Sequence, residues 1–106
     1  MSAGYFRKLD RLRGVAVWIE FKTVRGEMVD YAVVLFRAAG AETQVIRVYD
    51  GAHGVNEMHR HTRTEGKQPA SEFHSGTLSE GMNAAIKEIE RGYLAMIEAW
   101  EETWRK

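Results

Sequence analysis

Hydrophobic and polar residues alternate one by one over much of the first sixty positions. Between Val15 and Val24, apolar side chains occupy every second position, at Val15, Val17, Ile19 and Phe21. Successive side chains of a strand point to opposite faces of a sheet, so this period predicts a β-strand. Similar segments follow after short turns, and together they predict an antiparallel meander of about four strands. The predicted strands are Val15–Val24, Met28–Arg37, Thr43–Asp50 and about Val55–Arg63.

The end of the chain has a different period. Thr77-Leu78-Ser79-Glu80 fits a capping box, in which the threonine and glutamate side chains satisfy amides at a helix start. Apolar residues then recur every three or four positions, which predicts one long helix over residues 77–106. Gly92 costs helix stability, so we expect a close backbone approach there. The apolar stripe consists of Met82, Ile86, Ile89, Tyr93, Met96, Trp100 and Trp104.

These segments predict a single α+β domain, because 106 residues leave no room for a second core of useful size. The meander packs against the long C-terminal helix. The expected parts are a basic N-terminal segment (1–14), the β-meander (15–63), a loop (64–76) and the C-terminal helix (77–106).

Both faces of the predicted sheet are apolar, whereas one helix covers only one of them. The second face carries Trp18, Met28, Ala32, Val34, Phe36, Ile46 and Val48. Two candidates could cover this second face. One is the N-terminal segment, in which Tyr5, Leu9 and Leu12 have helical spacing, and the other is a second copy of the chain. A homodimer is therefore one expected assembly.

Composition narrows the function classes. Fifteen basic residues balance fifteen acidic ones, so any contact with RNA or DNA must be local. The absence of cysteine excludes disulfides, thiol catalysis and thiolate metal sites. No apolar run is long enough for a signal peptide or a membrane span, so we expect a cytoplasmic protein without a membrane partner.

All four histidines fall within 22 residues, at His53, His59, His61 and His74. Imidazole titrates near neutral pH and binds metals, so such a cluster suits proton transfer, metal binding or anion binding after protonation. Two histidines could act as acid and base on a phosphodiester while nearby arginines stabilise negative charge. The candidate catalytic residues are Asp50, His53, His59 and His61, and the candidate substrate-binding residues are Arg47, Arg60 and Arg63.

Two other interpretations of the histidines stay open. His59 and His61 project from one side of a strand, where Glu57 or Asp50 could complete a metal site. Alternatively, the histidines are structural and secure a turn and a loop against the sheet. Because neither alternative has a complete ligand set, we assign no metal ligand and no cofactor from the sequence.

The segment Arg47-Val48-Tyr49-Asp50-Gly51-Ala52-His53-Gly54, continued by His59-Arg60-His61 and Gly66-Lys67, carries a resemblance. It resembles a family of small uncharacterised prokaryotic proteins with an Arg-x-Tyr-Asp-x-Ala-His-Gly signature, further histidines and a C-terminal helix. More distantly, it is similar to the TumE family of toxin-antitoxin proteins, which have a similar sheet and a histidine-rich hairpin. The match covers about residues 43–74.

This resemblance implies a sheet-plus-helix protein of the prokaryotic cytosol, with an antitoxin protein as a partner. It also implies a toxin that acts on RNA or nucleotides through the histidine patch. The alternative functions are a noncatalytic, dimeric binding module and a metal-binding protein with histidine and carboxylate ligands. Whether the chain is an enzyme stays open from its sequence.

Overall fold

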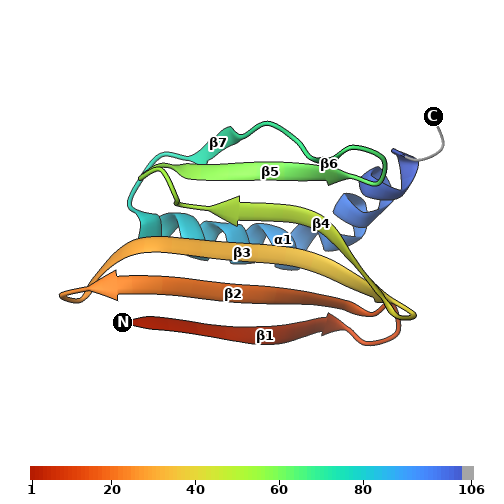
Figure 1. Ribbon diagram of the computed structural model, residues 1–106, viewed down its shortest axis with the longest axis horizontal. Helices are drawn as coiled ribbons and strands as arrows, with labels where there is room; N and C mark the ends of the chain where they lie inside the picture. The colour runs from red at the N-terminus through yellow and green to blue at the C-terminus, as the bar shows by residue number, and fades with distance from the viewer. Residues whose placement is uncertain (104–106) are drawn as a thin grey trace.

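The computed structural model describes residues 1–103 and has an antiparallel sheet with one long helix packed against it (Figure 1). The α+β prediction is confirmed, but the predicted number of strands is too low, because the sheet has seven. The order across the sheet is β1-β2-β3-β4-β5-β6, and β7 also pairs with β5. The elements are β1 (Ser2–Asp10), β2 (Val15–Val24), β3 (Glu27–Ala39), β4 (Glu42–Asp50), β5 (Asn56–Thr62), β6 (Gly66–Lys67), β7 (Ser71–His74) and α1 (Leu78–Glu102).

The N-terminal segment is a strand at the edge of the sheet and does not cover a sheet face. β1 runs antiparallel to β2, with Tyr5 opposite Ile19 and Phe6 opposite Trp18. The helical spacing of three apolar residues was therefore misleading. An edge strand needs a neighbour on one side only, and charged residues such as Arg7 and Lys8 are common there.

The predicted loop at 64–76 contains the two short strands β6 and β7, both of which pair with β5. Gly66–Lys67 and Ser71–His74 are too short and too polar to show a strand period. Backbone pairing with β5, which the sequence pattern does not encode, decides their conformation.

Helix α1 begins as predicted. Thr77 Oγ1 accepts a hydrogen bond from Glu80 N at 3.1 Å, and Glu80 Oε1 accepts one from Thr77 N at 3.0 Å. The close backbone approach lies at Gly81, against the buried side chain of Asn56, and not at Gly92. Trp104 of the predicted stripe lies outside the described residues.

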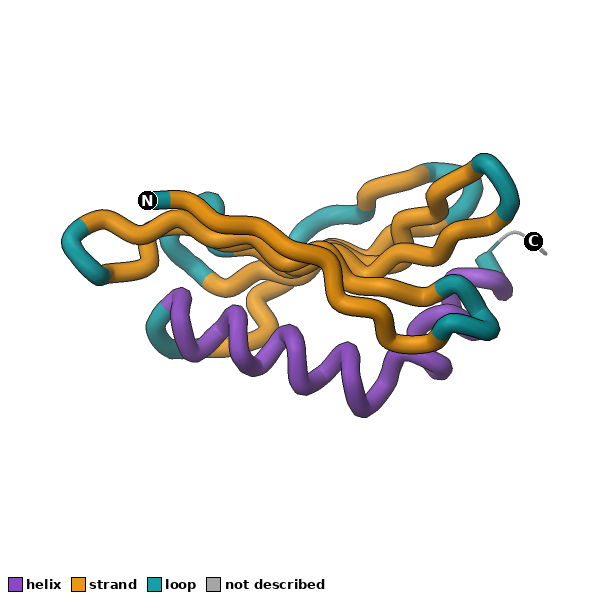
Figure 2. The backbone as a smooth tube through the Cα atoms, turned by 90° about the horizontal axis from the view of Figure 1, so that it is seen from below, coloured by secondary structure: helices purple, strands orange, loops and turns teal. Residues whose placement is uncertain are grey.

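The helix covers one face of the sheet, over β3, β4 and β5, and leaves the opposite face open (Figure 2). On the helix side, the predicted alternation of β2 is confirmed, because Val15, Val17 and Ile19 are buried in the core. The described helix is not apolar enough to cross a membrane.

Two residues expected on the open face belong to the helix side. Ile46 is buried in the core, and Met28 packs against it. Irregularities in the ladder explain both changes: one lies between Lys22 and Thr23 of β2, and another shifts the pairing of β4 after Leu35 of β3. An extra residue in one strand changes which face the following side chains occupy.

Candidate functional site

The end of β4 and the start of β5 bring together three of the four candidate catalytic residues. Asp50 and Glu57 are register partners, and His59 Nε2 lies 3.5 Å from Asp50 Oδ2. The side chains of His59 and Asp50 are only 13% and 15% exposed. His59 Nδ1 lies 2.9 Å from the carbonyl oxygen of Gln68, to which it donates a hydrogen bond. Both ring nitrogens of His59 are therefore engaged, one with a carboxylate and one with the backbone.

His53 forms the second pair of this region. Its Nδ1 lies 2.9 Å from Glu57 Oε1, and its side chain is 78% exposed. The Glu57 carboxylate raises the pKa of His53 above its ordinary value, and Asp50 adds to this rise. A carboxylate that orients an imidazole can support acid–base chemistry. However, this pair is open to water, which weakens any electrostatic stabilisation of a reacting group.

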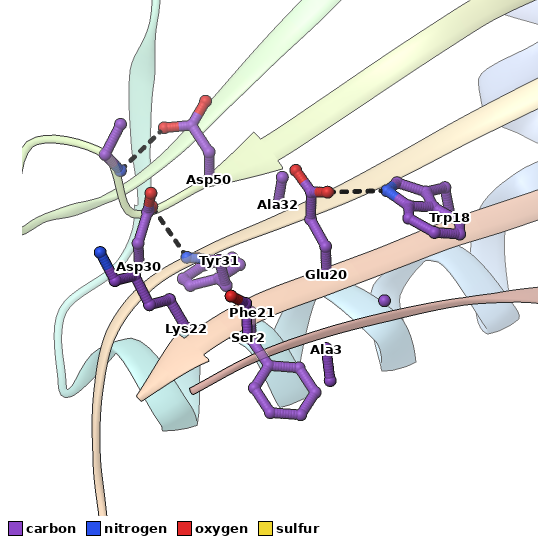
Figure 3. Close-up of a pocket in the computed structure, with 12 residues that line it drawn as sticks. Ser2, Ala3, Trp18, Glu20, Phe21, Lys22, Asp30, Tyr31, Ala32 and Asp50 are labelled. Carbon is purple, nitrogen blue, oxygen red and sulfur yellow. Dashed lines mark hydrogen bonds between the residues drawn. The ribbon is translucent and has the colours of Figure 1, made fainter. Parts of the chain in front are cut away.

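The open face beside these residues is hollowed and acidic (Figure 3). The hollow measures about 530 Å³ and is lined by the carboxylates of Glu20, Asp30 and Asp50, with Lys22 as the one basic lining residue. Glu20 Oε2 accepts a hydrogen bond from Trp18 Nε1 at 3.0 Å. This charge distribution repels phosphate, so it does not suit a phosphodiester substrate.

The candidate arginines Arg47 and Arg60 lie on the other side of the sheet. Together with α1 they line a cavity of about 350 Å³, which we call the helix-side cavity; its wall includes Arg47, Arg60, His61, Met96, Trp100 and Thr103. Arg47 is the register partner of Leu35, whose side chain is buried on the helix side, so the regular pairing of β3 with β4 directs Arg47 to this side. Arg47 Nη1 donates a hydrogen bond to the Tyr49 hydroxyl at 3.5 Å, and within residues 1–103 neither Arg47 nor Arg60 forms an ion pair.

Trp100 is the most buried polar group of the helix-side cavity. It is 5% exposed, and its Nε1 has no hydrogen-bond partner among the described residues. Arg37 and Arg63 lie over its ring, with their Cζ atoms 5.4 and 5.6 Å from the ring centroid. Arg63, the third candidate substrate-binding residue, also donates its backbone N–H to Thr103 Oγ1 at 3.1 Å.

The remaining histidines do not complete a cluster. His61 borders the helix-side cavity, and its buried Nε2 has no partner in the part of the chain that the structure describes. Burial lowers the pKa of His61, with smaller effects of Lys67 and His59. His74 lies in β7, where its carbonyl oxygen accepts a hydrogen bond from Asn56 Nδ2 at 3.3 Å. Across residues 1–103, no group of three or more histidine and carboxylate side chains is arranged to hold a metal ion.

The sheet thus divides the predicted site residues between two surfaces. Asp50, His53 and His59 belong to the open face, whereas Arg47 and Arg60 belong to the helix-side cavity. Trp100 belongs to the predicted apolar stripe of the C-terminal helix, and its place in a binding cavity was not predicted. Its indole N–H was the available signal, because a buried tryptophan usually finds a hydrogen-bond acceptor.

No protein family, curated protein or solved structure matches this chain. The resemblance to the Arg-x-Tyr-Asp-x-Ala-His-Gly family and to TumE stays a prediction, as do the toxin activity and the antitoxin partner. The function must therefore be argued from the two surfaces themselves.

Proposed function

We propose that this protein is a noncatalytic binding module for a phosphate-bearing ligand, such as a nucleotide, and that the ligand occupies the helix-side cavity. One observation carries the proposal: Trp100, whose buried indole N–H has no partner among residues 1–103, borders a cavity that Arg47 and Arg60 also line.

The donors define the ligand. An unsatisfied buried N–H costs about 1–3 kcal/mol, and a ligand acceptor would recover that cost. Tryptophan only donates, and the guanidinium groups of Arg47 and Arg60 donate and carry positive charge. Because the three donors come from β4, β5 and α1, they can approach one group from several directions. A phosphate group presents three strong acceptor oxygens and a charge of about −1.5 to −2 at pH 7, so it matches two guanidinium groups and an N–H better than a singly charged carboxylate.

The separation of the histidines supports binding without an acid–base step. His53 and His59 lie on the opposite side of the sheet from Arg47 and Arg60, and carboxylates surround them. A phosphate held at the helix-side cavity would therefore be out of their reach. His61 borders the same cavity, but one histidine does not supply the acid and base pair of a ribonuclease.

The test is calorimetric titration with inorganic phosphate, mononucleotides and a short single-stranded RNA. We expect saturable binding of at least one nucleotide. Arg47→Gln and Arg60→Gln should each weaken it by about tenfold or more, since a hydrogen bond to a charged group contributes about 1.5–3 kcal/mol. Arg25→Gln removes the same charge from the exposed β2–β3 turn and should leave the affinity unchanged.

Trp100→Phe separates ligand binding from packing. It keeps an aromatic ring between Arg37 and Arg63 but removes the N–H, so affinity should fall by about tenfold. The midpoint of thermal unfolding without ligand reports any packing defect. This control also matters for Arg60, because a cation near the last turn of a helix stabilises the helix dipole.

Two outcomes would overturn the proposal. One is the absence of saturable binding of phosphate, nucleotide and RNA. The other is an equal loss of affinity in Arg25→Gln and in the cavity variants, because it would indicate nonspecific attraction to positive charge.

A further inference from the structure

The open sheet face has an apolar centre. Phe6, Trp18, Val34 and Val48 are register partners across four strands, so their side chains form one row on this face. Phe6 is 66% exposed, and its ring centroid lies 4.5 Å from that of Trp18 and 5.6 Å from that of Phe36. α1 lies on the opposite side of the sheet (Figure 2). A patch of this kind usually marks an interaction surface.

Charges of opposite sign flank this apolar row. On one side, the carboxylates of Glu20, Asp30 and Asp50 line the acidic hollow. On the other side, Lys8 and Arg11 line a second hollow of about 420 Å³, together with Phe6 and Phe36. Asp10 also lies at this basic end, but Arg13 pairs with it at 2.9 Å. Lys22 lies at the acidic end, where three carboxylates outnumber it.

We propose that two copies of this chain pack face to face through the open sheet face and form a homodimer. A two-fold axis that runs across the strands, along the Phe6–Trp18–Val34–Val48 row, reverses the strand direction of the second copy. Each strand then lies over the same strand of the second copy, so Lys8 and Arg11, on β1 and its turn, lie over the part of the acidic hollow that Glu20 and Asp30 line. A two-fold interface must be complementary to itself, and a surface with opposite charges on either side of an apolar centre meets that requirement.

The net charge of the chain also permits a second copy as the partner. Fifteen basic residues balance fifteen acidic ones, so two copies carry no net charge that would keep them apart. The helix-side cavity lies on the opposite side of the sheet and stays accessible in such a dimer. Dimerisation and ligand binding can therefore fail independently.

The test uses sedimentation velocity of the full chain and two charge-reversed variants. One is Lys8→Glu/Arg11→Glu, and the other is Glu20→Lys/Asp30→Lys. We expect the wild type to sediment as a dimer of the 12.1 kDa chain. Each variant alone should dissociate about a hundredfold more readily, because like charges then face each other across the interface.

An equimolar mixture of the two variants distinguishes this geometry from other dimers. Each reversed end then faces a reversed end of opposite sign, so the mixture should associate about as tightly as the wild type. Arg25→Glu/Lys87→Glu changes the charge equally outside the open face and should dimerise normally. Circular dichroism checks that each variant is folded. Val34→Lys places a charge in the apolar row of the open face and should also weaken dimerisation.

A wild type that remains monomeric up to its solubility limit would overturn the inference and leave the face to a different protein. Normal dimerisation of both charge-reversed variants and of Val34→Lys would also overturn it, since the interface would then lie elsewhere, such as the β1 edge. Failure of the mixture to associate would refute the two-fold arrangement.

Discussion

Asn56 connects four parts of the molecule through one buried side chain. It is 1% exposed. Its Oδ1 accepts a hydrogen bond from the Tyr31 hydroxyl at 2.8 Å, and its Nδ2 donates to the carbonyl oxygens of His74, Gly76 and Thr77 at 3.2–3.3 Å. The amide thereby joins β3, β5 and β7 to the start of α1. A side chain held in this way cannot move aside, which explains the need for glycine at position 81.

We expect Gly81→Ala and Asn56→Ala each to lower the free energy of unfolding by about 3 kcal/mol, through overlap in the first and lost buried hydrogen bonds in the second. In the double variant the new methyl group occupies the space of the lost amide, so the total loss should be smaller than the sum. Urea unfolding measures all three. Gly92→Ala is the control, because its methyl group would meet only Met96 Cε, at an ordinary 3.5 Å. Additive losses would refute this coupling.

His61 and His53 should give stability opposite pH dependences. Burial lowers the pKa of His61, so its contribution is complete above its ordinary pKa of 6.5 and is lost as the pH falls through the lower folded-state value. Glu57 raises the pKa of His53, so its small, exposed contribution is present below 6.5 and is lost as the pH rises through the higher folded-state value.

Thermal unfolding between about pH 5 and 8 tests these signs. Below pH 6.5, the unfolding midpoint of His61→Gln should fall less steeply than that of the wild type. Above pH 6.5, the midpoint of His53→Gln should fall less steeply. Parallel curves for His61→Gln and the wild type would contradict the buried, neutral state of this imidazole.

At the level of elements, the start of α1 rests on the reciprocal bonds between Thr77 and Glu80. These bonds also lower the pKa of the Glu80 carboxyl. Thr77→Ala should cost about 1 kcal/mol of unfolding free energy in urea, because one amide of the first turn loses its acceptor. Ser79→Ala, two residues later and exposed, should change stability by less than about 0.5 kcal/mol. Equal effects would show that the cap does not hold the helix start.

Elements with a strong local period were predictable, whereas those formed by backbone pairing were not. The alternation of Val15–Val24 and the cap at Thr77 each identify an element from neighbouring residues alone. β1 depends on backbone pairing with β2, and the short strands β6 and β7 depend on pairing with β5, so none of them shows a clear period of its own. The pairing irregularity of β4 likewise has no signature in the sequence, yet it moves Ile46 from the open face into the core.

For the whole molecule, the sheet has one face that the helix buries and one that it leaves open. Val33 and Val34 are neighbours in β3, and their side chains lie on opposite faces of the sheet. Val33 is fully buried, whereas Val34 is partly exposed. Val33→Ala should cost about 2 kcal/mol of unfolding free energy because it leaves a cavity in the core. Val34→Ala should cost about 0.5 kcal/mol or less in dilute protein. Urea unfolding at low concentration measures both, and equal losses would contradict this asymmetry.

The sequence by itself determined the α+β class, the strands with clean alternation, the capped helix and the candidate residues around Asp50 and His59. Local periods and local hydrogen bonds encode these features. Only the tertiary structure decided that the sheet separates His53 and His59 from Arg47 and Arg60, and that Trp100, whose N–H has no partner among the described residues, borders the arginine-lined cavity. The face on which a side chain emerges depends on strand pairing and ladder irregularities, and these arise between two strands and are not encoded in the pattern of either one alone.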